Sequence, residues 1–324
     1  MAFWRRYRFE LIIGVVGFIA VNGIFVVNHV REFTRSDAEY SEHFGAFIGG
    51  YFGSLFSLAV MLLLLATLRT QRESAERQDF STKYFRLLAL HRQNVAEIEL
   101  DGGLITGRKV FVRIVDEFRR ALEVVKSISN NTAITRQQMI EAAFYGIFYG
   151  VGTNSTRMLS DALITVGIAK GSAVRISESL IKSKDALGRA GLIMFDGHQH
   201  RLGHYYRHLY QLVTYVDQQQ SSLLSDSEKY EYVKTVRAQL STHEQGLLLL
   251  DSLTPVGHRW WDEGLITKYR LVKNLPPNFF DSLYEFDMCK LFEKGYFESD
   301  EVEDELSRVY VNPKAFDPEM GSSR

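Results

Sequence analysis

The sequence has a single cysteine, Cys289, in 324 residues. One cysteine excludes an intramolecular disulfide framework and a cysteine-rich zinc module, and it fits a reducing, cytoplasmic setting for most of the chain. Prolines are also scarce, at five, and no run of alternating β-branched residues occurs, so long helices are predicted. Net charge is nearly absent as well. The 38 basic and 39 acidic side chains leave −1, so no bulk basicity indicates nucleic-acid binding.

The long motifs of common enzymes are missing too. The sequence contains no P-loop, no G-x-G-x-x-G that follows a strand and no G-x-S-x-G nucleophile elbow. It also has no internal repeat and no low-complexity tract. No cofactor is predicted, and the function has to be inferred from shorter patterns.

Two long apolar segments are present. Residues 9–27 are apolar apart from Glu10 and Asn22, and residues 44–68 carry no charge across 25 positions. An α-helix needs roughly 20 apolar residues to cross the hydrocarbon core, so both segments are predicted to span a membrane. Arginines precede the first segment, as in a signal peptide. No small-residue cleavage pattern follows it, however, so we expect this segment to be retained.

The arginines around these segments indicate their orientation. Lys and Arg favour the cytoplasmic side, whereas acidic residues count for little. The connecting stretch, residues 28–43, has fewer arginines than either outer flank and four acidic residues. A two-pass membrane protein with both termini in the cytoplasm is therefore expected. The arginines are Arg5, Arg6 and Arg8 before the first segment, Arg31 and Arg35 between the two, and Arg69, Arg72 and Arg77 after the second.

Small residues recur at a spacing of four in the second apolar segment. They are Gly45, Gly49, Gly53 and Ser57, which share one helix face. Small side chains let helix backbones approach closely in lipid. We expect the first membrane helix to pack there. A meeting of two copies of the protein on the same face is the alternative, and the two are compatible.

The rest of the chain is predicted to be a helical cytoplasmic domain, which makes the fold all-α. A three-to-four spacing of apolar residues runs from the second apolar segment to about Leu100, so that membrane helix is expected to continue as a stalk. The "DGGLITG" stretch then breaks the helix, and a helical pattern resumes after it. The predicted parts are a transmembrane hairpin, stalk helices, a helical core domain and an acidic, partly disordered tail, at residues 1–68, 69–128, 129–292 and 293–324.

Three later stretches have distinct patterns. Residues 142–152 are uncharged and too short to span a membrane, so a buried core helix is expected, with a ligand pocket as the alternative. Residues 225–255 are interpreted as a helix that begins at a capping box of Ser225 and Glu228 and ends at a proline. Residues 257–280 combine tryptophans with basic side chains. This pattern is typical of a solvated helix face or, alternatively, of a surface for RNA or anionic lipid.

Residues 197–217, "GHQHRLGHYYRHLYQLVTYVD", are the richest in chemically active side chains. His200, His204 and His208 recur at a spacing of four, and neighbours at this spacing can share a zinc ion. Eight residues of helix, roughly 12 Å, separate the outer two and exclude a single three-histidine site. The later "STHEQ" stretch does not complete an H-E-x-x-H motif. No metal site is predicted.

One hypothesis for this segment is a ribonuclease. Arg201 and His208 are seven residues apart and lie on nearly one helix face, with His204 nearby. An arginine can hold a phosphate, and a histidine can act as acid and base on a ribose 2′-hydroxyl. The spacing resembles the R-x4–6-H signature of the HEPN ribonuclease superfamily, although Leu202 stands where that superfamily has a polar residue. RNA would then be the substrate of a metal-independent reaction.

The other hypothesis is a buried polar seam, and it is the one we favour. His200 and Tyr205 would be hydrogen-bonded to Arg237, His243 and Glu244 of the following helix. Buried polar groups need such partners, and two facing helices can supply them.

Several sequence blocks resemble one bacterial family. The blocks "GHQHRLGHYYRHLYQLVTYVD", "YVKTVRAQLSTHEQGLLLLDSL" and "LITKYRLVKNLPP" occur in this order, and "KYFRLLALHRQNV" after the second apolar segment is similar to the family's stalk. Together, over roughly residues 44–280, they resemble the phage abortive infection family related to lactococcal AbiC. The resemblance implies a bacterial membrane protein that defends against bacteriophage by shutting down or killing the infected cell. It implies no catalytic residues.

The sequence thus predicts a membrane-anchored antiphage defence effector of the inner membrane. Its helical cytoplasmic domain is expected to sense or assemble, and to act through the membrane helices. The expected partners are the lipid bilayer, further copies of the chain, and a phage-derived trigger or a co-encoded defence component. The alternative is a membrane-tethered HEPN-like ribonuclease that uses Arg201 and His208. Whether the protein is an enzyme stays open at this point.

Overall fold

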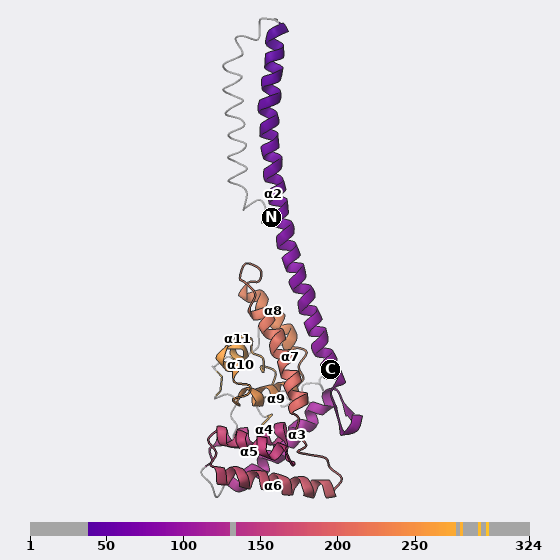
Figure 1. Ribbon diagram of the computed structural model, residues 1–324, viewed down its shortest axis with the longest axis vertical. Helices are drawn as coiled ribbons and strands as arrows, with labels where there is room; N and C mark the ends of the chain where they lie inside the picture. Colours follow the sequence, from indigo (N-terminus) through magenta and orange to yellow (C-terminus); the bar gives the residue numbers. More distant parts are fainter. Residues whose placement is uncertain (1–37, 130–133, 277–278, 281–290, 293–295, 298–324) are drawn as a thin grey trace, which may run out of the picture. The chain divides into compact units, whose positions relative to one another are not determined.

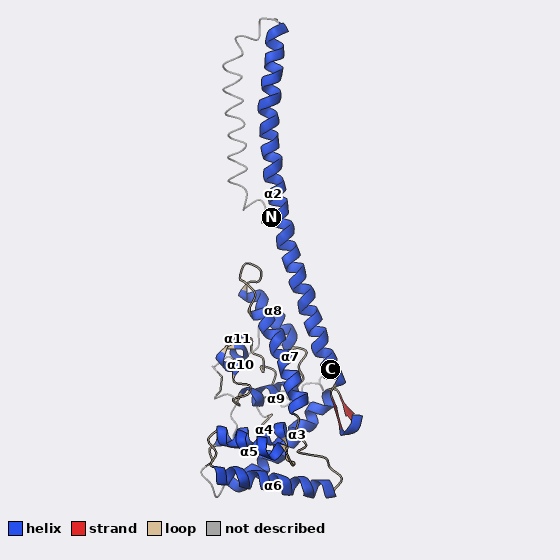
Figure 2. Cartoon of the chain, in the orientation of Figure 1, coloured by secondary structure: helices blue, strands red, loops and turns tan. Residues whose placement is uncertain are grey.

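The computed structural model describes residues 38–129, 134–276, 279–280, 291–292 and 296–297. The predicted first membrane segment, residues 9–27, lies outside this range, as does nearly all of the predicted acidic tail. The two-helix hairpin therefore stays a prediction. By its internal contacts the chain divides into two units, Met1–Ala75 and Glu76–Arg324. The described residues are mostly helical, which confirms the all-α class (Figure 2).

Helix α2 (Ala38–Glu97) contains both the second apolar segment and the predicted stalk. No glycine or proline follows Gly53 within it, so nothing in the sequence breaks the helix, and the predicted continuation is confirmed. Among the described residues, Phe52–Glu97 is the one helix long and apolar enough to cross a membrane. The mean hydropathy of its apolar window is 1.9, and none of that window is buried.

Hydroxyl groups in the apolar half of α2 are bonded within the helix itself. Ser57 Oγ donates to Gly53 O at 2.7 Å, Thr67 Oγ1 to Leu63 O at 2.8 Å, and Thr70 Oγ1 to Ala66 O at 3.1 Å. A polar group in lipid needs a partner because no water is available there. These hydroxyls therefore need no neighbouring helix to satisfy them.

A small hairpin follows α2 and confirms the predicted break. Strand β1 (Glu99–Leu100) pairs antiparallel with β2 (Ile105–Thr106), and a short 3-10 turn, η1 (Asp101–Gly103), connects them. The turn holds Gly102 at φ +65° and Gly103 at φ +92°, backbone conformations that glycine adopts at little cost. The hairpin sends the chain into the next helix of the folded unit.

Four helices then form the lower group in Figure 1. Helix α3 packs against α4 and α6, and α5 packs against both α4 and α6. Helix α4 begins at a capping box in which Thr135 and Gln138 bond each other's backbone N–H. Its residues from Ile140 to Phe148 are buried, which confirms the predicted core helix. The bounds are α3 (Arg108–Ser129), α4 (Arg136–Tyr149), α5 (Ser155–Thr165) and α6 (Lys170–Arg189).

The remaining helices include one correction to the sequence prediction. Residues 225–255 form two helices instead of one, with a break between Arg237 and Thr242. The break arises because Ser241 takes an extended backbone and starts a second capping box with Glu244. The predicted capping box of Ser225 and Glu228 is confirmed. The bounds are α7 (Gln199–Asp217), α8 (Asp226–Arg237), α9 (Thr242–Ser252), α10 (Arg259–Asp262) and α11 (Leu265–Lys268).

Two glycines let the chain pass closely against the end of α4 just before α7 begins. Gly150 has φ +73° and Gly197 has φ +89°. A Cβ at Gly197 would lie 2.4 Å from Tyr149 O, and one at Gly150 would lie 2.4 Å from Gly197 N. The N–H of His198 donates to the carbonyls of Ile147 and Phe148, both at 2.9 Å. The start of α7 is thereby fixed to the last turn of α4.

Candidate functional site

Helix α7 packs with α8 against the C-terminal part of α2 through aromatic rings. The ring of Phe80 lies 5.4 Å from that of Tyr215 on α7 and 5.0 Å from that of Tyr232 on α8. The Tyr84 hydroxyl donates to Tyr232 O at 2.8 Å. We call these four residues the α2 seam. Aromatic pairs at such distances add to the stability that burial alone gives.

Histidines lie at a second contact between α2 and α7, nearer the start of α7. His91 on α2 is buried, and its ring lies 5.1 Å from that of Tyr205. Burial, with the nearby His208 and Arg108, lowers the pKa of His91 to about 4. His91 is therefore uncharged near pH 7. His208 is half-buried, and its ring lies 4.5 Å from that of His204. Burial, together with the neighbouring His204 and Arg207, lowers the pKa of His208.

Arg201 is held away from His208. Its Nε donates to the carbonyl of Glu99 at 2.7 Å, and its Nη1 lies 3.5 Å from His198 Nδ1. Glu99 is the second residue after the end of α2. The arginine thus ties the start of α7 to the end of α2. Of the residues predicted for a ribonuclease site, only His204 and His208 contact each other.

The predicted polar seam is assembled in a different way. Tyr205 donates to Glu244 Oε1 at 3.1 Å, and Arg108 Nε lies 3.7 Å from Glu244 Oε2. Arg237 is buried, but its Nη1 faces the carbonyls of Tyr269 and Arg270. The two remaining seam residues do not take part. His243 packs its ring 5.5 Å from that of Phe279, and His200 is exposed.

A buried pair that sequence reasoning missed lies at the start of α7. His198 Nε2 lies 3.1 Å from Glu117 Oε2, and the two side chains are only 3% exposed. The other oxygen, Glu117 Oε1, accepts the N–H of Phe195 at 2.7 Å. Phe195 has φ +63°, which a non-glycine residue adopts only when its surroundings impose it. We call Glu117, Phe195 and His198 the carboxylate clasp.

A small cavity of about 280 Å³ opens beside the carboxylate clasp. Arg113 and Arg201 line it together with the clasp's acid and histidine. Sequence spacing does not indicate this arrangement, because His198 lies 81 residues after Glu117. Only the position of His198 inside the histidine-rich segment could have drawn attention to it.

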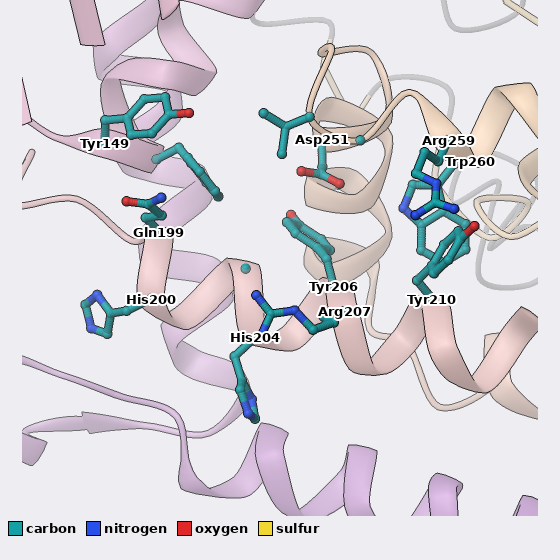
Figure 3. Close-up of a pocket in the computed structure, with 14 residues that line it drawn as sticks. Tyr149, Gln199, His200, His204, Tyr206, Arg207, Tyr210, Asp251, Arg259 and Trp260 are labelled. Carbon is teal, nitrogen blue, oxygen red and sulfur yellow. The ribbon is translucent and has the colours of Figure 1, made fainter. Parts of the chain in front are cut away.

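A larger pocket of about 670 Å³ lies on another side of α7 (Figure 3). Asp251 from the last turn of α9 lies among its lining residues, near Tyr206. Figure 3 shows His200 and His204 pointing away from Asp251, so neither histidine reaches it. The pocket is lined by Phe148, Tyr149, Gln199, His200, Gly203, His204, Tyr206, Arg207, Tyr210, Asp251, Val256, Gly257, Arg259 and Trp260.

The glycine face of α2 is open in the described part of the chain. No described atom lies within 4 Å of a Cβ built on Gly45, Gly49 or Gly53. The Ser57 hydroxyl donates its hydrogen bond to the carbonyl of Gly53. The packing of the first membrane helix, or of a second copy, on this face stays a prediction.

Metal ligands do not gather within the described ranges. No group of three His, Cys, Asp or Glu side chains there could hold an ion. The three histidines at a spacing of four contribute to packing and pocket walls instead.

The segment that contains α7 to α11 also carries the likeness to known proteins. Residues 197–280 match the family described as "putative phage abortive infection protein". This match confirms the family resemblance over these residues, whereas the stalk block falls outside it. No curated protein and no solved structure matches the chain.

We call residues 197–280 the abortive-infection segment. It contains all of α7 to α11, Tyr215 and Tyr232 of the α2 seam, and His198 of the carboxylate clasp. It also contributes every lining residue of the larger pocket except Phe148 and Tyr149. The family match therefore coincides with the part of the molecule where the contacts to α2 and the pocket meet.

Proposed function

We propose that this protein is a membrane-anchored phage-defence effector in which the abortive-infection segment controls helix α2. The phage-defence role has the support of the family match. The mechanism is supported by the contacts between that segment and α2. One helix contains both the apolar stretch and the residues of the α2 seam.

Three kinds of contact support control through α2. Aromatic rings pack along the α2 seam, Arg77 pairs with Glu228 at 3.1 Å, and Arg201 holds the carbonyl of Glu99. They lie along the stretch from Arg77 of α2 to Glu99, just past its end. A change in α7 or α8 would therefore shift or rotate α2, since packed cores move between discrete arrangements and do not deform continuously.

In this proposal α2 crosses the inner membrane, and residues 9–27 form the second pass, with both termini in the cytoplasm. The signal would be a phage-derived trigger or a co-encoded defence component that acts on the abortive-infection segment. The output would be self-association of α2 in the bilayer. The contacts of Arg201 do not favour the ribonuclease alternative, because the guanidinium is already used by the carbonyl of Glu99.

A proline in α2 tests the coupling. Ser74 is exposed and lies between the apolar stretch and the α2 seam. Ser74→Pro removes a helix hydrogen bond and kinks the helix, at about 3 kcal/mol, without touching the folded core. We expect Ser74→Pro cells to lose protection in a phage plaque assay while the protein level in the membrane fraction stays the same.

Two matched variants accompany this test. Ser74→Ala should protect like the wild type because alanine continues the helix. His208→Ala should also retain protection, and its loss in a stable protein would favour the ribonuclease. Full protection by Ser74→Pro at normal membrane level would refute control through α2.

Self-association predicts a second loss of function. Gly49→Leu combined with Gly53→Leu places bulky side chains on the face where two backbones would approach. We expect reduced cross-linking between copies in membranes, together with loss of phage protection. Leu62→Ile combined with Leu63→Ile is the control and should change neither the cross-linking nor the phage protection. Protection that persists without cross-linking would rule out self-association on this face.

A further inference from the structure

The small cavity beside the carboxylate clasp has two charged side chains without a described partner. Arg113 on α3 is half-buried, and its Nε has no hydrogen-bond partner among the described residues. Asp101 in the turn η1 is also half-buried, and its carboxylate forms no hydrogen bond or ion pair with a described residue. Both line the cavity, but they do not pair with each other. Charged groups held away from water need partners, and a bound molecule can supply them.

The other charged groups of the cavity wall already have partners. The acid and the histidine of the clasp bond each other, and Asp196 Oδ1 lies 2.5 Å from Lys184 Nζ. Arg201 donates from its Nε to a backbone carbonyl at the exit of α2. The two arginines are balanced by Asp101 and by the carboxylate of the clasp, so the wall is close to neutral overall. A ligand that matches this wall therefore carries charges of both signs.

Apolar side chains complete the wall of the cavity. Leu100 and Met194 are buried, and Ile193 is exposed at the same cavity. The volume of about 280 Å³ lies just below the range of about 300–1,000 Å³ that is usual for drug-sized ligands. The ligand is therefore small, and it has an apolar part as well as its charged groups.

From these features we infer that the cavity binds a free α-amino acid with an apolar side chain. Its carboxylate lies on the Arg113 guanidinium, its ammonium group lies on the Asp101 carboxylate, and its side chain lies against Ile193. An amino acid carries both charges close together and is neutral overall, as the wall nearly is. This binding goes beyond the proposed control through α2, and it can be measured without a phage assay.

A phosphate group is the main competing ligand, because arginines commonly hold phosphate. A phosphate monoester carries about −1.5 to −2 charges near pH 7. It would bring them next to the carboxylates of Asp101, Asp196 and the clasp, which line the same cavity. Like charges at short range repel each other. An amino acid instead gives one partner to Arg113 and one to Asp101, so the wall favours it.

Equilibrium dialysis of the full-length protein in detergent against radiolabelled L-leucine tests this inference. We expect saturable binding with a Kd below about 1 mM. Absence of saturable binding in this range would overturn the proposal. Displacement of leucine by inorganic phosphate at equal concentration would indicate an anion site and would overturn the choice of an amino acid.

Unlabelled analogues of leucine identify which charges the cavity recognises. Isoamylamine lacks the carboxylate, isocaproic acid lacks the ammonium group, and glycine lacks the apolar side chain. Each should displace leucine at least about tenfold less well than leucine itself, because each leaves a part of the wall without its partner. Equal displacement by isocaproic acid or by isoamylamine would refute a site that binds both charges.

Single variants assign each charge to its residue. Arg113→Gln and Asp101→Asn should each weaken leucine binding by about tenfold or more. Leucine and isoamylamine should then bind equally to Arg113→Gln, and leucine and isocaproic acid equally to Asp101→Asn, because the distinguishing partner is gone. Asparagine tolerates the left-handed backbone of this turn, so the hairpin is kept.

Matched controls have the same side-chain changes on distant, exposed positions. Arg175→Gln on α6 and Asp161→Asn on α5 should leave leucine binding unchanged. Thermal unfolding of each variant verifies its fold. Unchanged affinity for leucine in a folded Arg113→Gln or Asp101→Asn protein would refute the site.

Discussion

Replacing Glu117 with alanine is expected to lower the free energy of unfolding by about 3–5 kcal/mol. The acid accepts hydrogen bonds from His198 Nε2 and from the N–H of Phe195, and both donors are buried. Its removal leaves both without partners and releases the left-handed backbone at Phe195. For a folded unit of this size we expect the Tm to fall by about 10 °C. Thermal unfolding of the full-length protein in detergent, followed by near-UV circular dichroism, measures the change.

Two further variants distinguish the loss of the clasp hydrogen bonds from the loss of side-chain volume. Glu117→Gln keeps an oxygen acceptor for one of the two donors, so we expect it to cost about half as much as the alanine change. His198→Ala combined with Glu117→Ala should cost less than the sum of the single changes, by about 1–3 kcal/mol, because the two side chains contact each other. Additive costs, or an alanine variant as stable as wild type, would show that the clasp does not hold the start of α7.

The second large effect is a fall in stability with rising pH that depends on Asp251. Its pKa is raised from 3.8 to about 8 by burial, so the folded protein keeps a proton that the unfolded chain releases. Stability from this group is complete below about pH 4 and is lost as pH rises through about 8. Between pH 5 and 8 the loss is about 4 kcal/mol. Tm values measured across this range for wild type and Asp251→Asn provide the test.

The comparison with Asp251→Asn is needed because other groups titrate in the same range. The pKa values of His91, His200, His208 and His243 are lowered, mainly by burial, and these histidines contribute stability that increases with pH. Their effect is common to both proteins and cancels in the difference. We expect the stability of Asp251→Asn relative to wild type to rise by about 4 kcal/mol between pH 5 and pH 8. Parallel pH profiles of the two proteins would contradict a buried neutral acid.

Local patterns predicted the elements of this fold well. The continuous helix α2 followed from apolar spacing and from the absence of glycine and proline after Gly53. The break at residues 101–107 and the capping box of Ser225 and Glu228 followed from residues that act over three or four positions. The second capping box at Ser241 was equally readable and was missed, because the apolar pattern on both sides of it suggested one uninterrupted helix.

The candidate sites depend on contacts that no spacing records. Arg201 and His208 share a helix face, but the carbonyl of Glu99 holds the arginine from 102 residues away in sequence. Glu117 and Asp251 each look like an ordinary acid in an amphipathic helix. Their roles come from helices that meet only in the folded unit, and no spacing in the sequence indicates those contacts.

The backbone contact between Gly150 and Gly197 links two parts of the molecule that otherwise look separate. Tyr149, which lines the larger pocket, is directly followed by Gly150, and Gly197 is directly followed by His198 of the carboxylate clasp. No side chain separates the two backbone segments, so neither segment can shift without displacing the other. A molecule that moves the pocket wall must also move the first residues of α7, and through Arg201 the exit of α2. The two glycines thus provide a short mechanical route from the wall of the pocket to the end of α2.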